Sequence, residues 1–262
     1  RPACREHTTR ETPMENSSGI RTIEDMDSGQ LAALVIDLLH RMMMHYAMWY
    51  SETAHQMGTD RAYALLDSAS PSIIKTCVER LCAFAGIESI GGIPSPLSGM
   101  PEHRLLELTS EIAKCWLAAD GIWFQAVERE YGMNDAKRCN DTCWAHFSPF
   151  EAWSIKRFLG LGDRPGLDGL ERALRFRLYA RINVQSIIRE DDNTLVFRMD
   201  DCRVQSARKR KGMPDYPCKS AGLVEYSRFA EAIDPGIKTE CIGCPPDPHP
   251  EEWFCAWRFY MR

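Results

Sequence analysis

The fold class is decided by residues 184–199, VQSIIREDDNTLVFRM. In two short runs, 184–189 and 194–199, apolar and polar residues alternate, and turn-forming Asp and Asn residues separate the runs. Such alternation places every second side chain on one face of a strand, and a short connection of this composition is typical of a β-hairpin. Residues 237–241 and 253–261 also have strand character, the latter because it is rich in aromatic residues. These runs predict a small antiparallel sheet in the last third of the chain.

The segments before and between these strands have helical periodicity. From Ser28 to about Met57, large apolar residues recur every three or four positions, which predicts one long helix that ends near Gly58. Further helices are expected at residues 60–66, 72–84, 170–182 and 219–233. The stretch 86–101 is rich in glycine and proline and is expected to be a linker.

The helical layout occurs twice, at a constant offset of 74 positions. The corresponding residues are Trp49, Gly58 and Ala62 in the first copy, and Trp123, Gly132 and Ala136 in the second. Pro71 and Pro149 are each expected to open the next helix of their copy. We interpret the pattern as a duplicated helical hairpin unit. The alternative is chance similarity, because two amphipathic helices align their apolar positions by periodicity alone.

These patterns predict an α+β protein. Its N-terminal two-thirds are mostly helical and contain the duplicated hairpin unit, and its C-terminal part is a small antiparallel sheet with helices and a Cys-rich metal site. Residues 1–13 look unlike the rest and are expected to be disordered or a non-native start, with Met14 as a candidate start codon. Residues 14–160 would form the helical region and residues 161–262 the α+β region, both packed as one globular unit.

The charge and hydropathy of the chain bear on its location. The 262 residues include 32 Lys and Arg against 37 Asp and Glu, a formal charge of -5, so no general positive field is available for nucleic acid or anionic lipid. No apolar run reaches the roughly 18 residues of a membrane helix. The start lacks the apolar core of a signal peptide. We expect a cytoplasmic protein with reduced cysteines that binds neither nucleic acid nor membrane.

Five of the eleven cysteines fall in the tail: Cys202, Cys218, Cys241, Cys244 and Cys255. The Cys-x-x-Cys spacing of Cys241 and Cys244 lets two sulfurs approach one ion at about 2.3 Å, and the glycine between them permits a tight turn. The remaining thiols could complete the site, because an antiparallel sheet brings loop ends together. Thiolates select zinc or an iron–sulfur cluster, and the spacing does not separate the two. A redox dithiol and inert thiols are the alternatives.

Two other residues of the tail are candidates for catalysis. His249, in an Asp-Pro-His-Pro loop, could ligate a metal or act as a base; a surface histidine is the alternative. Arg203 begins a basic run that extends to Lys211. It could clamp an anionic carboxylate or neutralise thiolate charge, or the run could be an exposed basic face.

Four motifs are family-specific: Asp120-Gly-Ile-Trp-Phe124, Asp201-Cys-Arg-Val-Gln205, Cys241-x-x-Cys-Pro-Pro-Asp247 and Cys255-Ala-Trp-Arg-Phe259. They resemble an uncharacterised family of cytosolic proteins found largely in anaerobic bacteria, from about Met14 to the end. A more distant similarity is to the L-2-amino-thiazoline-4-carboxylic acid hydrolase-like family and to vinyl reductase-type sensor domains. That similarity implies a ligand pocket between helices and sheet with a thiol near it, although the extra cysteines depart from both patterns.

The function expected from these features is that of a metal-dependent hydrolase or lyase acting on a small carboxylate- or sulfur-containing molecule. The five tail cysteines would hold zinc or an iron–sulfur cluster, assisted by Arg203 or His249. The alternative is a non-catalytic small-molecule sensor or a structural metal-binding module. The expected partner is a small-molecule ligand, and the Trp-bearing helices could also form the face of a homo-oligomer.

Overall fold

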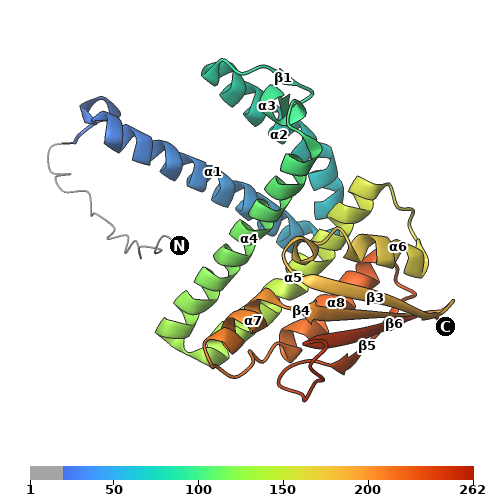
Figure 1. The fold of residues 1–262 in the computed structure, drawn as a ribbon. Coiled ribbons are helices and arrows are strands. Elements are labelled where there is room, and N and C mark those ends of the chain that lie inside the picture. Colours follow the sequence, from blue (N-terminus) through green and yellow to red (C-terminus); the bar gives the residue numbers. More distant parts are fainter. Residues whose placement is uncertain (1–19) are drawn as a thin grey trace. The chain divides into compact units, whose positions relative to one another are not determined.

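The structure is a computed structural model that describes residues 20–262. In this range the chain forms two compact units, one ending at Gly99 and the other running Met100–Arg262 (Figure 1). Residues 1–13 and Met14, expected to form a disordered or non-native start, lie outside the described residues. No helix in residues 20–262 is long and apolar enough to span a bilayer.

The first unit is built on a helical hairpin of α1 (Ser28–Met57) and α2 (Thr59–Ala85). Asp27 caps α1: its side chain accepts from the Gln30 N–H at 2.8 Å, while the Gln30 side chain accepts from the Asp27 N–H at 3.0 Å. Gly58 joins the helices at a φ of 87°, a conformation that side chains disfavour. The smaller elements are η2 (Ile23–Asp25), β1 (Ser89–Ile90), β2 (Ile93–Pro94) and α3 (Ser95–Ser98).

The second unit begins with a hairpin of the same design. Its helices are α4 (Glu102–Tyr131) and α5 (Met133–Leu159), joined by Gly132 at a φ of 88°. The long helices α1 and α4 both have 30 residues, and α2 and α5 both have 27. The offset of 74 that suggested a duplication is therefore also the offset between the bounds of these helices.

Pro71 and Pro149 lie inside α2 and α5. The prediction that each proline opens a new helix, and with it the separate helices at 60–66 and 72–84, is wrong. A proline inside a helix removes one backbone donor and disturbs one turn, which packing can outweigh. The residues before the prolines, Ser70 and Ser148, are both buried. This is consistent with packing that holds the two halves of each helix together.

The sheet of the second unit contains the predicted hairpin. In the described residues, β3 (Val184–Asp191), β4 (Thr194–Asp201), β5 (Lys238–Gly243) and β6 (Cys255–Tyr260) form one four-stranded antiparallel sheet in the order β3-β4-β6-β5. Trp257 in the inner strand β6 pairs with Phe197 on one side and Cys241 on the other. The structure thus confirms the α+β class, with helices through most of the N-terminal two-thirds and the sheet at the C-terminal end.

Four further helices lie around the strands of the second unit. Between α5 and β3 the chain forms α6 (Gly166–Leu174) and η3 (Leu178–Arg181), and between β4 and β5 it forms α7 (Arg203–Arg210) and α8 (Lys219–Ile233). The last of these has the bounds that the periodicity predicted. The helix expected over 170–182 instead ends at Leu174. Arg177 has extended backbone there, and its side chain is fully buried, so the chain leaves the helical path to place this residue inside the protein.

The core lies between the sheet and helices α5, α6 and α8, which Figure 1 shows beside the strands. Tyr226 on α8 stacks on Trp257 with ring centroids 4.7 Å apart. Gly222 lies one turn earlier on the same helix, and a Cβ atom there would meet the Trp257 ring at 2.6 Å. The absence of a side chain at Gly222 is therefore what allows α8 to approach the sheet so closely.

We predict that Gly222→Ala lowers the free energy of unfolding by about 1–2 kcal/mol, because overpacking against Trp257 exceeds the gain in helix propensity. Gly121→Ala in α4 is the matched control. A Cβ at Gly121 meets nothing within 4 Å, so that substitution should stabilise the protein by about 0.5–1 kcal/mol. Urea denaturation of both variants measures the difference. Equal shifts in the two midpoints would contradict the close approach of α8.

Candidate functional site

The second unit contains a cavity of about 620 Å³, a volume typical of small-molecule sites. Its wall is formed by α4, α5, η3, α7, the 213–218 segment, α8 and the connection between β5 and β6. Aromatic side chains contribute much of the lining: Phe124, Trp144, Tyr179, Tyr216, Tyr226 and Phe254. The cavity can therefore bury the apolar part of a ligand. A small number of polar and charged lining residues remain to bind the polar groups of that ligand.

Four of the five tail cysteines line this cavity. They are Cys202 just before α7, Cys218 just before α8, Cys244 just after β5 and Cys255 at the start of β6. The fifth, Cys241, lies within β5, is half-buried against the core and does not line the cavity. The Cys-x-x-Cys pair is thus divided. The chain instead brings together one thiol from between β4 and α7, one from between α7 and α8, and two from the opposite ends of the β5–β6 connection.

The positions of two of these thiols are held by contacts from neighbouring segments. The buried Gln205 side chain donates to the Tyr216 carbonyl at 2.8 Å and to the Cys218 Sγ at 3.2 Å, and it accepts from the Tyr216 N–H at 2.8 Å. The Lys219 N–H donates to the Pro245 carbonyl at 2.8 Å, which ties the start of α8 to the segment that carries Cys244. These contacts therefore hold the segments that carry Cys218 and Cys244 in place at the wall of the cavity.

Burial favours the neutral form of Cys202, Cys218 and Cys244. Desolvation raises the pKa of Cys202 to about 11 and raises that of Cys218 well above its ordinary value. A hydrogen bond with Cys255, together with burial, raises the pKa of Cys244. Neutral thiols are weak nucleophiles and weak ligands, so reactivity here would require a cation that displaces the protons.

No metal site is seen in residues 20–262: no three Cys, His, Asp or Glu side chains there are arranged to hold an ion. Cys244 and Cys255 are in hydrogen-bond contact, but no third ligand completes a site with them in the described residues. A zinc site needs sulfurs about 2.3 Å from the ion, so metal binding would have to draw the thiols inward. The donor set itself is the soft one that zinc and iron–sulfur clusters prefer. The metal-binding role of the cysteines stays a prediction.

His249 lies outside the cavity lining. Its Nε2 is 2.9 Å from Asp215 Oδ2, and its Nδ1 is 2.8 Å from the Pro250 carbonyl. Burial lowers the pKa of His249, but the contact with Asp215 outweighs it and the net shift is upward. With both ring nitrogens engaged, His249 links the 213–218 segment to the connection between β5 and β6.

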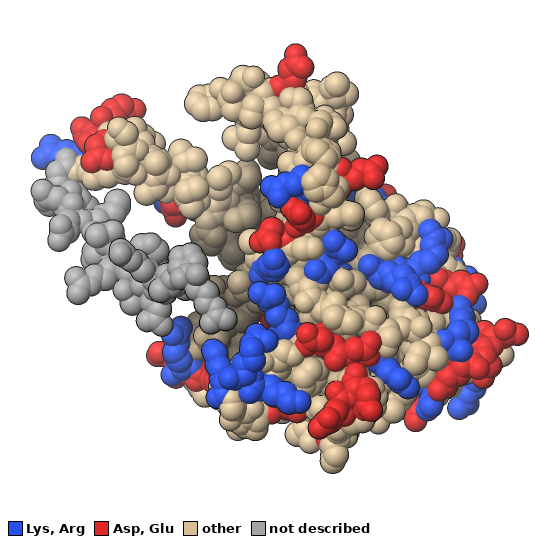
Figure 2. Space-filling model, in the orientation of Figure 1, with Lys and Arg blue, Asp and Glu red and all other residues tan. Residues whose placement is uncertain are grey.

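Arg203 is exposed at the start of α7 and also lies outside the cavity lining. Its N–H donates to the Asn183 side chain at 2.9 Å. Arg208 and Lys211, from the same basic run, do line the cavity. Figure 2 shows Lys and Arg side chains gathered where α7 lies in Figure 1. The carboxylate-binding role expected of Arg203 stays a prediction, and the basic residues of this run that line the cavity are Arg208 and Lys211.

A buried ionic group beside the cavity was not foreseen from the sequence. Arg177 Nε lies 2.8 Å from Glu151 Oε2 on α5, and Arg177 Nη2 lies 2.7 Å from Glu225 Oε1 on α8. Four aromatic rings surround the guanidinium, with centroids 4.7 to 5.9 Å away: Trp144, Tyr179, Tyr226 and Phe229. The local sequence does not distinguish Arg177, which is one of four arginines between positions 172 and 181, and its carboxylate partners lie far away in the sequence.

Glu225 is the member of this group that lines the cavity. Burial raises its pKa to about 7; the Arg177 guanidinium opposes the shift, and the Glu151 and Asp120 carboxylates add to it. A buried carboxyl group at the cavity therefore changes protonation near neutral pH. Perturbed groups of this kind, placed in a cavity, are candidates for ligand binding or proton transfer.

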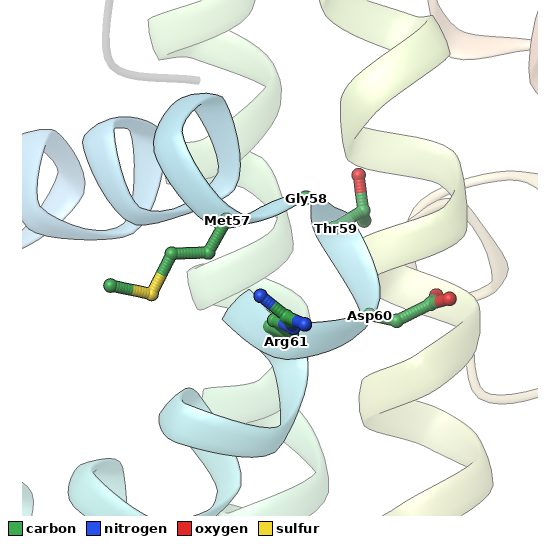
Figure 3. A pocket seen from close by; sticks show the side chains of 5 residues that line it. All are labelled: Met57, Gly58, Thr59, Asp60 and Arg61. Carbon is green, nitrogen blue, oxygen red and sulfur yellow. The ribbon is translucent and has the colours of Figure 1, made fainter.

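The first unit has a hollow of its own at the joint between α1 and α2, with a volume of about 610 Å³. It is lined by Met57, Gly58, Thr59, Asp60 and Arg61 (Figure 3). Figure 3 shows the side chains of Met57, Asp60 and Arg61 pointing in different directions. Because these groups do not converge, the hollow is a weaker candidate than the thiol-lined cavity.

We predict that Glu225 makes the protein less stable as the pH rises from about 4.5, its ordinary pKa, to about 7. The folded state holds the Glu225 proton more tightly than the unfolded state, so the free energy of unfolding falls with pH in this window. Glu225→Gln should flatten that fall. Glu231→Gln, which changes an exposed carboxylate on the same helix, should leave it intact. Denaturant unfolding across the window provides the comparison, and the same slope in all three proteins would contradict the assignment.

A family model described as a family of unknown function, DUF6125, matches residues 98–261. The match includes every residue that lines the thiol cavity and leaves α1 and α2 outside. No curated protein and no solved structure matches the chain. The resemblance to an uncharacterised family is therefore confirmed from residue 98 onward.

Proposed function

We infer the function of this chain, which belongs to the DUF6125 family, from the cavity of its second unit. We propose that the four cavity cysteines bind a thiophilic metal centre, zinc or an iron–sulfur cluster, and that a small molecule binds in the space beside it. The reaction class proposed is hydrolysis or a lyase reaction. The observation that carries the proposal is that four thiols, supplied by three different connections of the chain, line a single cavity.

The chemistry of the donor set supports a metal centre. Buried thiols near one another oppose ionisation, and both Cys202 and Cys255 raise the pKa of Cys218. A bound cation would instead favour ionisation of the thiols, because it stabilises thiolates directly. Metal binding would bring the sulfurs closer together, because no metal cage is formed in the described part of the chain. The metal would supply Lewis-acid activation of a carbonyl group or of water.

Other groups of the cavity suit a small polar substrate. Arg208 and Lys211 provide positive charge on the α7 side, which suits a substrate carboxylate. Glu225 can accept or donate a proton near neutral pH, and Arg177 holds its carboxyl group in place. The aromatic lining would provide apolar surface against which the body of the substrate could pack. Together they give the cavity a means of binding, orientation and proton transfer.

A second candidate function is a small-molecule sensor without catalysis. The observation in its favour is that the thiols line the cavity without forming a metal cage, while the cavity already has the volume of a ligand site. In that case the metal-free protein would be the working form. Ligand binding would then be independent of metal content, which separates the two functions.

We predict that the full chain, purified without oxygen after growth with zinc and iron, carries a metal centre that Cys244→Ser and Cys255→Ser each reduce severely. Losing one of four thiolate ligands should weaken binding strongly. Elemental analysis measures the metal, and a visible spectrum distinguishes an iron–sulfur cluster from colourless zinc. Cys241→Ser should retain the metal, because Cys241 lies off the cavity.

The controls for this experiment are Cys115→Ser and Cys139→Ser. Both thiols are exposed on the helices of the second hairpin, so their replacement should change neither metal content nor fold. Circular dichroism checks that each variant is folded. A wild-type chain that stays free of metal even after reconstitution, or an equal loss in the control variants, would refute the metal centre and favour the sensor.

A further inference from the structure

The buried ionic group beside the cavity is one positive charge short. Arg177 supplies one guanidinium to two carboxylates, Glu151 and Glu225. Both oxygens of Glu151 are engaged, one by Arg177 and the other by the Leu178 N–H at 2.9 Å. Glu225 Oε1 lies 2.7 Å from Arg177 Nη2 but has no partner with hydrogen-bond geometry in residues 20–262. The charge deficit therefore falls on Glu225.

Glu225 is also the member of the group that a ligand can reach. Its side chain is 8% exposed, and it lines the cavity together with the rings of Tyr179 and Tyr226. Asp120, on α4, lines the same cavity and makes no hydrogen bond or ion pair in the described part of the chain. Carboxylates beside aromatic faces are the environment that organic cations prefer.

We propose that the part of the cavity at Glu225 is a subsite for a cationic nitrogen, an ammonium or amidinium group of a small molecule, which pairs with the Glu225 carboxylate and contacts the rings of Tyr179 and Tyr226. The inference rests on the proposed function and deepens it, because it names a charged group of the bound molecule. The cations Arg208 and Lys211 lie on the α7 side, so a ligand with a carboxylate as well would find complementary charge at both ends.

A proton competes with the ligand cation for the Glu225 carboxylate. Groups that face Glu225 and set its charge are the Arg177 guanidinium, the Glu151 and Asp120 carboxyls, the Cys218 thiol and the hydroxyls of Tyr179 and Tyr226. Of these, only Arg177 is cationic. A ligand cation would replace the proton on Glu225 and complete the neutralisation that Arg177 begins.

The test compares two probes of one shape on the metal-free wild-type chain, benzylamine and benzyl alcohol, by calorimetry or ligand-observed NMR. The amine should bind about tenfold more tightly or better, as a charge-assisted contact requires. Glu225→Gln should abolish the preference. Asp120→Asn should reduce it, and Glu231→Gln, on the outer face of the same helix, should leave it unchanged.

A pH series on the wild-type protein keeps the test valid if Glu225→Gln does not fold. Alkylamines stay protonated through neutral pH, so affinity for benzylamine should rise as the pH passes about 7 and Glu225 ionises, while affinity for benzyl alcohol stays flat. Equal binding of both probes at every pH, or a preference that survives in Glu225→Gln, would overturn the subsite.

The outcome is separable from that of the metal experiment. The probes are applied to metal-free protein, so the subsite can be confirmed where no metal binds. Conversely, a chain that binds metal through its cavity cysteines but shows no preference for the amine would retain the metal centre and lose the cationic subsite.

Discussion

The burial of one guanidinium constrains much of the second unit. A lone charge inside a protein costs several kcal/mol, so the fully buried Arg177 requires carboxylates at contact distance. Glu151 on α5 and Glu225 on α8 meet that requirement, and each is itself buried. The three groups together constrain how α5, α8 and the segment before η3 are arranged. Because α8 also packs on Trp257 of the sheet, the same group relates the helical hairpin to the strands.

The ionic group also shapes the chemistry of the cavity. Its second carboxylate, Glu225, faces the cavity, while Arg208 and Lys211 contribute positive charge from the α7 side. Three of the thiols lie in connections between elements and Cys255 begins β6; the side-chain amide of Gln205 holds the segment that carries Cys218. A cavity with soft sulfur donors, a carboxyl group that titrates near neutral pH and an aromatic lining is equipped for both binding and proton transfer.

Local patterns predicted the elements well. Alternation located the β3–β4 hairpin, helical spacing gave α8 its bounds, and the offset of 74 anticipated two hairpins of equal dimensions. Proline rules failed at Pro71 and Pro149, because tertiary packing can outweigh a weak local preference. For the candidate site, the tail cysteines were singled out by their position near turns. Their spacing did not reveal that Cys241 lies off the cavity, because half-burial within β5 depends on what packs against that strand.

The sequence by itself determined where the strands and most of the helical segments lie, and that thiols gather near the ends of the C-terminal elements, since periodicity and turn composition act over a few residues. Only the tertiary structure decided which four thiols line the cavity, that Arg208 and Lys211 line it while Arg203 does not, and that a buried arginine has two carboxylate partners. The physical reason is that burial, charge pairing and the direction of a side chain arise between segments far apart in the chain, where no local rule applies.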